Sequence, residues 1–273
     1  MKFFYLTVLF VLTGISSVYS NFTITKFSAA SFCSTYPSSY VSGSFSLNET
    51  TKGGVKGFTK SQTNATLVIG FSNTSFQFNP GVGTVTASGT EVTIVSYSIT
   101  ATAITVTINT SSTNAELNTI NFNNIEVRAQ AAATGFIKRT GGTFKVDNKT
   151  TKPLSTTSWG DLTAGTPLAY SSSTATQAVT ASVFTGTTDN QIIGVQVVVA
   201  GTCSSVTTTS FNFNTTGSTL PLTDISKAKL YYTGTTNIFS AGTLFGSINN
   251  PNGAFTINGS QALNLGAEPT ISG

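Results

Sequence analysis

Short segments in which apolar and polar residues alternate recur along the chain. Residues 104–108 alternate isoleucine or valine with threonine, and residues 193–199 repeat a similar alternation further on. A period of two is the pattern of a β-strand with one buried face. Such segments follow one another at a spacing of about 8–12 residues, between glycine-rich turns, as in a β-sandwich. The pattern predicts an all-β protein built from antiparallel β-sandwiches.

Two of the alternating segments change phase in the middle. Between residues 92 and 99 the alternation shifts across Val95, and between residues 120 and 127 it shifts across Asn123 and Asn124. One extra residue in a strand turns the following side chains to the other face. We therefore expect a β-bulge, or a strand that changes faces, at both places.

The composition supports strands over helices. Thr, Val, Ile and Phe suit a pleated, half-buried surface, while strong helix formers are scarce. Charged residues make up 8% of the chain, and 20 Phe and 8 Tyr can fill cores, so the composition is not that of a disordered protein. The roughly 250 residues after the N-terminal segment suit two domains of ordinary size. We expect two tandem β-sandwiches, at residues 21–147 and 177–273.

The first 20 residues differ from the rest. Lys2 is followed by an apolar run and then by small and polar residues, with Val18 and Ser20 at the positions that precede a cleavage site. The run is shorter than the roughly 18 residues that a membrane span requires. Residues 1–20 are therefore predicted to be a cleaved signal peptide, which makes the protein secreted and leaves Asn21 as its first residue.

A Ser/Thr-rich stretch separates the two predicted domains. Residues 148–176 contain Pro153 and Pro167 and show little periodicity, so we expect a linker there. Trp159 lies inside this stretch and predicts one point at which the linker is anchored to a domain.

Histidine is absent, which excludes Ser-His-Asp and Cys-His nucleophile pairs and nearly all transition-metal sites. The nine carboxylates lie far apart in the sequence, although distant strands could still bring two of them together as in a glycosidase. No phosphate-binding glycine motif and no calcium-binding run is present. We expect no enzyme activity, no cofactor and no metal.

The formal net charge is +4, and the densest basic stretch flanks a Gly-Gly turn and the predicted linker. Its members are Lys138, Arg139, Lys145, Lys149 and Lys152. A nucleic-acid site would instead need basic residues interleaved with aromatics on one face. These charges are interpreted as solvated loop residues, and no nucleic-acid partner is expected.

The sequence has two cysteines, Cys33 and Cys203. An even number in an exported chain suggests a disulfide, but these two fall in different predicted domains. A bridge would need their Cα atoms within about 7 Å of each other. The alternative is two buried thiols, and the sequence leaves both readings open.

Three blocks of the second domain occur in a familiar order. They are Gly-Thr-Cys-Ser-Ser-Val-Thr at 201–207, Thr-Asp-Ile-Ser-Lys-Ala-Lys-Leu-Tyr-Tyr-Thr-Gly at 223–234, and Phe-Thr-Ile-Asn-Gly-Ser-Gln-Ala-Leu at 255–263. Over residues 177–266 the chain resembles the BNR-repeat neuraminidase N-terminal domain family. The resemblance implies a β-sandwich accessory module of bacterial surface proteins exported by the type IX system. It does not imply sialidase activity, since the Ser-x-Asp-x-Gly-x-x-Thr-Trp box is missing.

The first domain resembles, more loosely, the cohesin-like or Ig-like repeats of similar proteins. The second domain departs from its family near the end, because Leu265-Gly266 is followed by Ala267-Glu268-Pro269 in place of an aromatic strand. We therefore expect a final strand to be missing, and an open sheet edge near residues 255–257 that a following segment or a partner would complete.

These observations lead to a non-catalytic surface protein, either structural or an adhesive module of a larger adhesin. Its expected partners are an extracellular surface, a polysaccharide or other surface-protein modules, with no membrane span after signal removal. The alternative is a carbohydrate-binding module that accompanies a glycan-active enzyme. That function needs exposed aromatic rings, and the candidates are Trp159, Tyr36, Tyr40 and Tyr231. Each could instead pack into a core.

Overall fold

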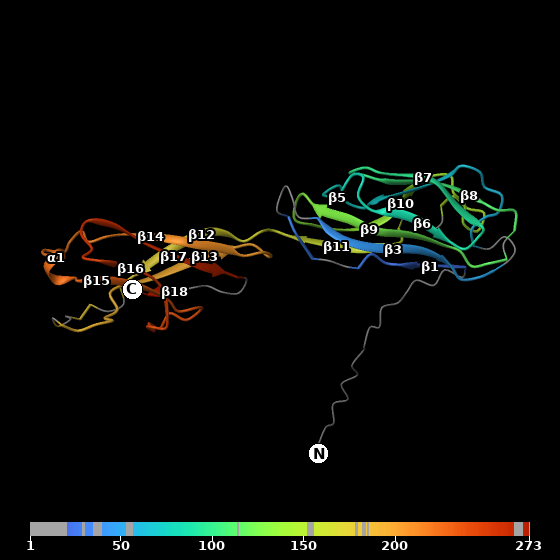
Figure 1. Cartoon of the computed structure of the whole chain (residues 1–273). Helices are drawn as coiled ribbons and strands as arrows, with labels where there is room; N and C mark the ends of the chain where they lie inside the picture. The colour runs from blue at the N-terminus through green and yellow to red at the C-terminus, as the bar shows by residue number, and fades with distance from the viewer. Residues whose placement is uncertain are drawn as a thin grey trace, which may run out of the picture. The chain divides into compact units, whose positions relative to one another are not determined.

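A computed structural model of the chain is almost entirely β and divides into two compact units, residues 1–164 and 165–273 (Figure 1). The structure describes residues 21–28, 31–34, 40–52, 57–113, 115–151, 156–177, 180, 181, 184, 186–264 and 270–272. The predicted signal peptide, residues 1–20, lies outside them.

The first unit is built from two sheets. One contains β1 (Phe22–Thr25), β3 (Val41–Glu49), β5 (Phe76–Phe78), β6 (Thr84–Ser88) and β9 (Thr119–Ala129). The other runs in the order β2 (Ser31–Cys33), β11 (Gly160–Gly165), β10 (Ala133–Gly141), β4 (Ala65–Phe71), β8 (Ile104–Thr110) and β7 (Val92–Ile99). In the first sheet β9 is central, because it pairs antiparallel with β3 on one side and with β5 and β6 on the other.

The inward faces of these two sheets share one core. Leu67 and Val106 of one sheet and Phe122 and Val127 of the other are fully buried and belong to the same apolar cluster. Trp159 also lies in this cluster, and its ring stands edge-on to that of Phe122 with 6.2 Å between the centroids. A core shared by the facing sheets is the architecture of a β-sandwich, as the alternation predicted.

The two predicted phase changes are β-bulges. The pairing of β7 with β8 shifts between Ile94 and Ser96, so that Val95 is the extra residue. On β9 the extra residues stand opposite Ser44, between the partners of Gly43 and Phe45, and Asn124 there has a φ of 51°. Asn tolerates this left-handed conformation better than most residues, which explains its place at the shift.

The second unit has a five-stranded sheet and a two-stranded sheet. The larger sheet runs in the order β12 (Ala169–Thr176), β13 (Gly194–Ala200), β18 (Thr270–Ser272), β15 (Lys227–Tyr232) and β16 (Thr243–Asn249). The smaller one pairs β14 (Val206–Asn214) with β17 (Ala254–Leu263). The helix α1 (Pro221–Asp224) is a single turn, and no described helix is long and apolar enough to cross a membrane.

One expectation about this part of the chain is wrong, and the structure adds a strand that the sequence pattern did not indicate. The stretch predicted to be a linker, 148–176, contains β11 and β12, and the division between the units falls after Ala164. The alternation of apolar and polar residues did not indicate β12, because all of its residues are exposed and no apolar face marks it as a strand. Near the end of the chain, Thr270–Ser272 forms β18 inside the larger sheet, and the expectation of a missing final strand stays a prediction.

Candidate functional site

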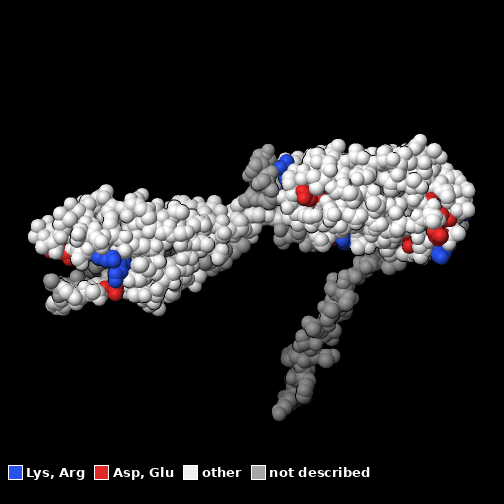
Figure 2. All heavy atoms as spheres, viewed as in Figure 1, with Lys and Arg blue, Asp and Glu red and all other residues white. Residues whose placement is uncertain are grey.

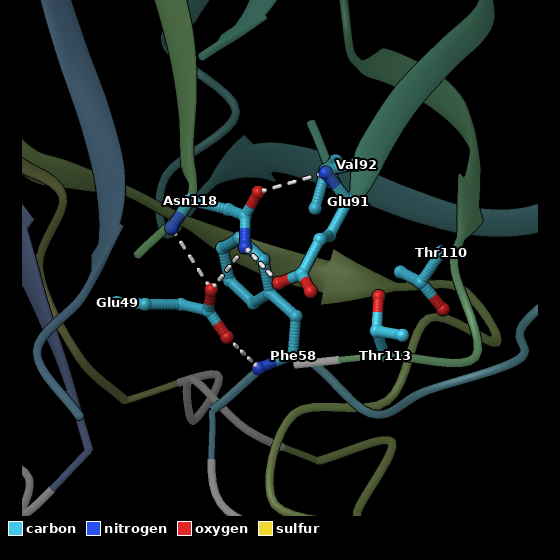
Figure 3. Close-up of a pocket in the computed structure, with 7 residues that line it drawn as sticks. All are labelled: Glu49, Phe58, Glu91, Val92, Thr110, Thr113 and Asn118. Carbon is cyan, nitrogen blue, oxygen red and sulfur yellow. Dashed lines mark hydrogen bonds between the residues drawn. The ribbon is translucent and has the colours of Figure 1, made fainter. Parts of the chain in front are cut away.

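The fold brings two carboxylates together at one end of the first unit. Glu49 is the last residue of β3, Glu91 immediately precedes β7, and Asn118 immediately precedes β9. All three side chains are buried. Figure 3 shows them pointing toward one another, and we call this group the carboxylate cluster.

A single amide links the two acids of the carboxylate cluster. Nδ2 of Asn118 donates to Oε2 of Glu49 at 2.8 Å and to Oε2 of Glu91 at 3.3 Å (Figure 3). In the other direction, the backbone N–H of Glu91 donates to Oδ1 of Asn118 at 3.3 Å. Asn118 therefore holds the two carboxyl groups side by side through Nδ2, and its Oδ1 fixes the backbone of Glu91.

The remaining acceptor positions of both carboxylates are taken by backbone N–H groups from two loops. Glu49 accepts from the N–H of Phe58 and, at 3.0 Å, from the N–H of Asn118. Glu91 accepts from Ala115 at 2.7 Å and from Glu116 at 3.2 Å. A buried loop N–H without a partner is costly, so these contacts fix the loops that join β3 to β4 and β8 to β9.

The surroundings move the two pKa values in opposite directions. Burial raises the pKa of Glu49, and the negative charge of Glu91 adds to the rise, against the hydrogen bonds from Phe58 and Asn118. Burial also acts to raise the pKa of Glu91, but the hydrogen bonds from Ala115, Thr113, Glu116 and Asn118 outweigh it and lower that pKa to about 2. Glu91 is thus the acid of the pair that is held ionised.

The space between the two acids is small. The cavity has a volume of about 10 Å³ and is lined by Glu49, Phe58, Glu91, Val92, Thr110, Thr113 and Asn118. That is close to the least space that holds one water molecule, whereas ligand pockets measure about 300–1,000 Å³. A glycosidase pair must admit a sugar between its carboxyl groups. The carboxylate cluster has no room for a sugar, so the role that its geometry supports is to stabilise the surrounding loops.

Two glycines make this close packing possible. Gly57, with a φ of 83°, presses against Oε1 of Glu49, and Gly89, with a φ of 93°, presses against Oδ1 of Asn118. In both places a Cβ atom would overlap the oxygen, and the backbone conformation disfavours other residues as well. The turns that contain these glycines therefore pack directly against the carboxylate cluster.

Sequence reasoning missed the carboxylate cluster, because residues 49, 91 and 118 are far apart in the chain. The available signal was positional, since each polar residue stands next to the end of an alternating segment. No group of three or more His, Cys, Asp or Glu residues in the described part of the chain could hold a metal ion.

The aromatic candidates for carbohydrate binding do not form a platform among the described residues. Trp159 is fully buried in the first core, which contradicts its predicted role in glycan contact. Tyr231 is only 9% exposed and stands edge-on to Phe239. Tyr40 is partly buried, with the guanidinium of Arg128 4.9 Å from its ring centre, and Tyr36 lies outside the described residues. Large rings gain more from burial than from exposure, which explains the outcome for Trp159 and Tyr231.

Cys33 and Cys203 are each disulfide-bonded, and the described residues contain no free cysteine. In the first unit Cys33 ends β2, the strand beside β11. In the second unit Sγ of Cys203 packs against Gly165, where a Cβ atom would lie 3.2 Å from it. The pairing of these two cysteines with each other stays a prediction, which peptide mapping without reduction tests.

In comparisons with known proteins, the chain matches no family model, no curated protein and no solved structure. The likeness to the neuraminidase N-terminal domain family and to cohesin-like or Ig-like repeats therefore stays a proposal that rests on the sequence blocks alone.

Proposed function

We propose that the chain is a non-catalytic, exported protein of a bacterial cell surface, and that it acts as a structural or adhesive module of a larger adhesin. The observation that carries the proposal is the state of the carboxylate cluster. Its two acids are enclosed, and they accept hydrogen bonds from the chain's own donors. The acids thus serve the fold and are not available to a substrate.

The surface supports a binding role that does not depend on charge. In Figure 2 the charged side chains occupy a few small groups, and most of the visible surface is neither acidic nor basic. Ser and Thr hydroxyls dominate the exposed strand β12, and Tyr170 on the same strand is 62% exposed. Such a surface recognises a neutral partner, such as a polysaccharide or another surface module, by hydrogen bonds and apolar contact.

The proposed location rests on the sequence. The signal-peptide pattern of residues 1–20 leads to export, and the likeness to modules of type IX-exported proteins leads to the cell surface. The carbohydrate-binding alternative would place the same uncharged surface beside a glycan-active enzyme. It has lost Trp159 as a contact residue, because that ring is buried.

Binding assays with residues 21–273 test the proposal. The protein is incubated with insoluble cellulose, chitin, peptidoglycan and a bacterial outer-membrane fraction, at low and at high NaCl concentration. We expect retention on at least one of them, and retention should not weaken with salt, because screening acts mainly on charged contacts. Retention on a polysaccharide alone would favour the carbohydrate-binding alternative.

The same incubation checks the absence of catalysis. Soluble sugar released from any polysaccharide would contradict the non-catalytic proposal. If the protein is retained on none of the four materials, the adhesive part of the proposal is overturned. A Glu91→Gln variant serves as the control for catalysis, since a hydrolase that used this acid would lose its release of sugar.

A further inference from the structure

The chain carries eight Asn-x-Ser/Thr triplets that the proposed function does not use. In exported proteins this triplet is the motif at which glycans are attached to the asparagine side chain. The triplets begin at Asn21, Asn48, Asn64, Asn73, Asn109, Asn148, Asn214 and Asn258. Because Ser and Thr are abundant in this chain, the motif alone does not distinguish one triplet from another, and the local geometry has to decide.

In three of the triplets, the nitrogen that would carry the glycan is already engaged. Nδ2 of Asn21 donates to Oδ2 of Asp147 at 3.0 Å, and Asn21 is buried. Nδ2 of Asn48 donates to Oγ1 of Thr25 at 3.1 Å. Nδ2 of Asn73 donates to a backbone carbonyl oxygen, also at 3.1 Å. Each of these hydrogen bonds would have to break before the side chain could react.

The triplet at Asn214 has a geometry of its own. Oδ1 of Asn214 accepts the backbone N–H of Thr216 at 2.8 Å and the hydroxyl of Thr216 at 2.5 Å. Nδ2 of Asn214 has no hydrogen-bond partner among the residues that the structure describes, and both Asn214 and Thr216 are exposed. In the described part of the chain, no other triplet has its own hydroxyl bonded to its asparagine; those of Thr66 and Ser111, for example, bond elsewhere.

The folded chain holds this triplet in place through its middle residue. The backbone N–H of Thr215 donates to the carbonyl oxygen of Gly253 at 3.0 Å, and the N–H of Gly253 donates to Oγ1 of Thr215 at 2.8 Å. Thr215 thus ties the turn after β14 to the turn before β17. The turn has open space beside it, since a Cβ atom on Gly217 would meet no heavy atom within 4 Å. A large group can therefore reach Asn214 while the chain stays folded.

We propose that Asn214 is a glycosylation site, at which an oligosaccharyl transferase attaches a glycan to the folded chain from a lipid-diphosphate-linked sugar. A bond forms between Nδ2 and C1 of the sugar, and the bond between C1 and the diphosphate oxygen breaks, with its electron pair leaving on the diphosphate. Nδ2 gives one proton to a base of the transferase. The two donors of Thr216 stabilise the negative charge that gathers on Oδ1 as this proton leaves.

The modification goes beyond the proposed function and rests only on the export that it includes, because this triplet is an acceptor in secreted proteins. Its test measures the mass of the protein and the position of the added sugar. The adhesive role is tested by retention on a surface. Either proposal can therefore fail while the other stands.

The first experiment compares the folded chain with its unfolded peptides as acceptors. Residues 21–273, produced without glycans, are incubated with a purified single-subunit oligosaccharyl transferase and lipid-diphosphate-linked chitobiose, either folded or as a tryptic digest. We expect the intact mass of the folded chain to rise by one glycan, located on Asn214 by peptide mapping. The digest should be modified at several triplets, because the contacts that distinguish them are gone. Equal modification of other triplets in the folded chain would show that the turn does not select Asn214.

The second experiment removes the hydroxyl that donates to Oδ1. Thr216→Val keeps the shape of the side chain and should slow transfer to the folded chain at least about tenfold, whereas Thr216→Ser keeps the hydroxyl and should retain most of the rate. Asn214→Gln should remove the mass increase altogether. Thr150→Val makes the same change in the triplet at Asn148 and should leave transfer unchanged. Because Thr216 is exposed, its variants should keep the melting temperature of the wild type.

The outcomes that overturn the inference are specific. If the digest accepts a glycan on Asn214 and the folded chain does not, the fold hides the site. If neither form accepts a glycan there, the triplet is not an acceptor. If Thr216→Val reacts as fast as the wild type, the hydroxyl on Oδ1 has no part in the transfer.

Discussion

The two units are built from similar residues, yet they bury them very differently. In the described part of the first unit, one apolar cluster joins both sheets and includes many fully buried side chains. The second unit has two clusters with three buried residues each, around which the aromatic rings are only partly covered. Of the ten large apolar side chains that are exposed among the described residues, seven lie in the second unit. Composition alone therefore does not set core depth.

The difference follows from how the sheets are completed. In the first unit β9 has neighbours along both sides, and the carboxylate cluster fixes the loops at one end. In the second unit the smaller sheet has two strands, and the edge strand β12 of the larger sheet is exposed along its whole length. We therefore expect the first unit to be a rigid support and the second to be the part that adapts to partners.

The largest expected effect is the loss of a ring from the deep core. Phe122→Ala removes a fully buried ring that stacks on Phe45 with 4.4 Å between the centroids, and it should cost about 3–5 kcal/mol of unfolding free energy. Phe211→Ala in the second unit should cost clearly less, since that ring is only partly buried. Urea unfolding measured by circular dichroism checks both. Equal costs would contradict the difference in core depth.

The next effect concerns the carboxylate cluster. Glu91→Gln leaves one oxygen where the backbone N–H groups of Ala115 and Glu116 and Nδ2 of Asn118 need two, so the first unit should lose about 1.5–3 kcal/mol. Trp159 is the only tryptophan of the chain and reports unfolding of this unit by fluorescence. Glu116→Gln is the matched control, because the carboxylate of Glu116 accepts exposed hydrogen bonds from Thr90. A cost as small as that of the control would rule out a structural role for Glu91.

The acid dependence of the first unit should come from the same residue. The pKa of Glu91 is lowered from 4.5 to about 2, so its contribution to stability is present above pH 4.5 and is lost as the pH falls toward 2. Glu49, whose pKa is raised, acts in the opposite sense, since its ionisation costs stability as the pH rises above its ordinary value. Urea midpoints from Trp159 fluorescence at several pH values should therefore fall with acid in the wild type. The fall should be weaker in the Glu91→Gln variant, and an unchanged fall would assign the effect to other groups.

The smallest expected effect is on the exposed face of the second unit. Tyr170→Ala on β12 should change the unfolding free energy by less than about 0.5 kcal/mol, because the ring is largely in solvent. The same variant should weaken retention on the binding material if β12 belongs to the adhesive surface. A large loss of stability would contradict the exposed position of Tyr170, because it would mean that the ring is packed against another part of the protein.

Period-two alternation was enough to find the strands with one buried face. It placed the strands around residues 104–108 and 193–199, and its phase changes at Val95 and at Asn123 and Asn124 located two β-bulges. It failed at β12, because a strand exposed on both faces leaves no apolar trace.

The carboxylate cluster could not be predicted for a different reason. Its three members meet only after three strand ends have been brought together, and the linear sequence carries no measure of that distance. A similar limit applies to Trp159, which was expected to anchor a linker to a domain and lies in the first core. Its neighbours Phe45 and Phe122 are contributed by strands far away in the sequence.

Amide hydrogen exchange, measured peptide by peptide on residues 21–273, tests the contrast between the two units most directly. Exchange reports local opening, which is rare where a strand is paired on both sides and its side chains are buried. We predict the slowest exchange in β4, β8 and β9 of the first unit, and exchange that is markedly faster in β12 and β14 of the second. Equal protection in the two units would contradict the account of a rigid first unit and an adaptable second one.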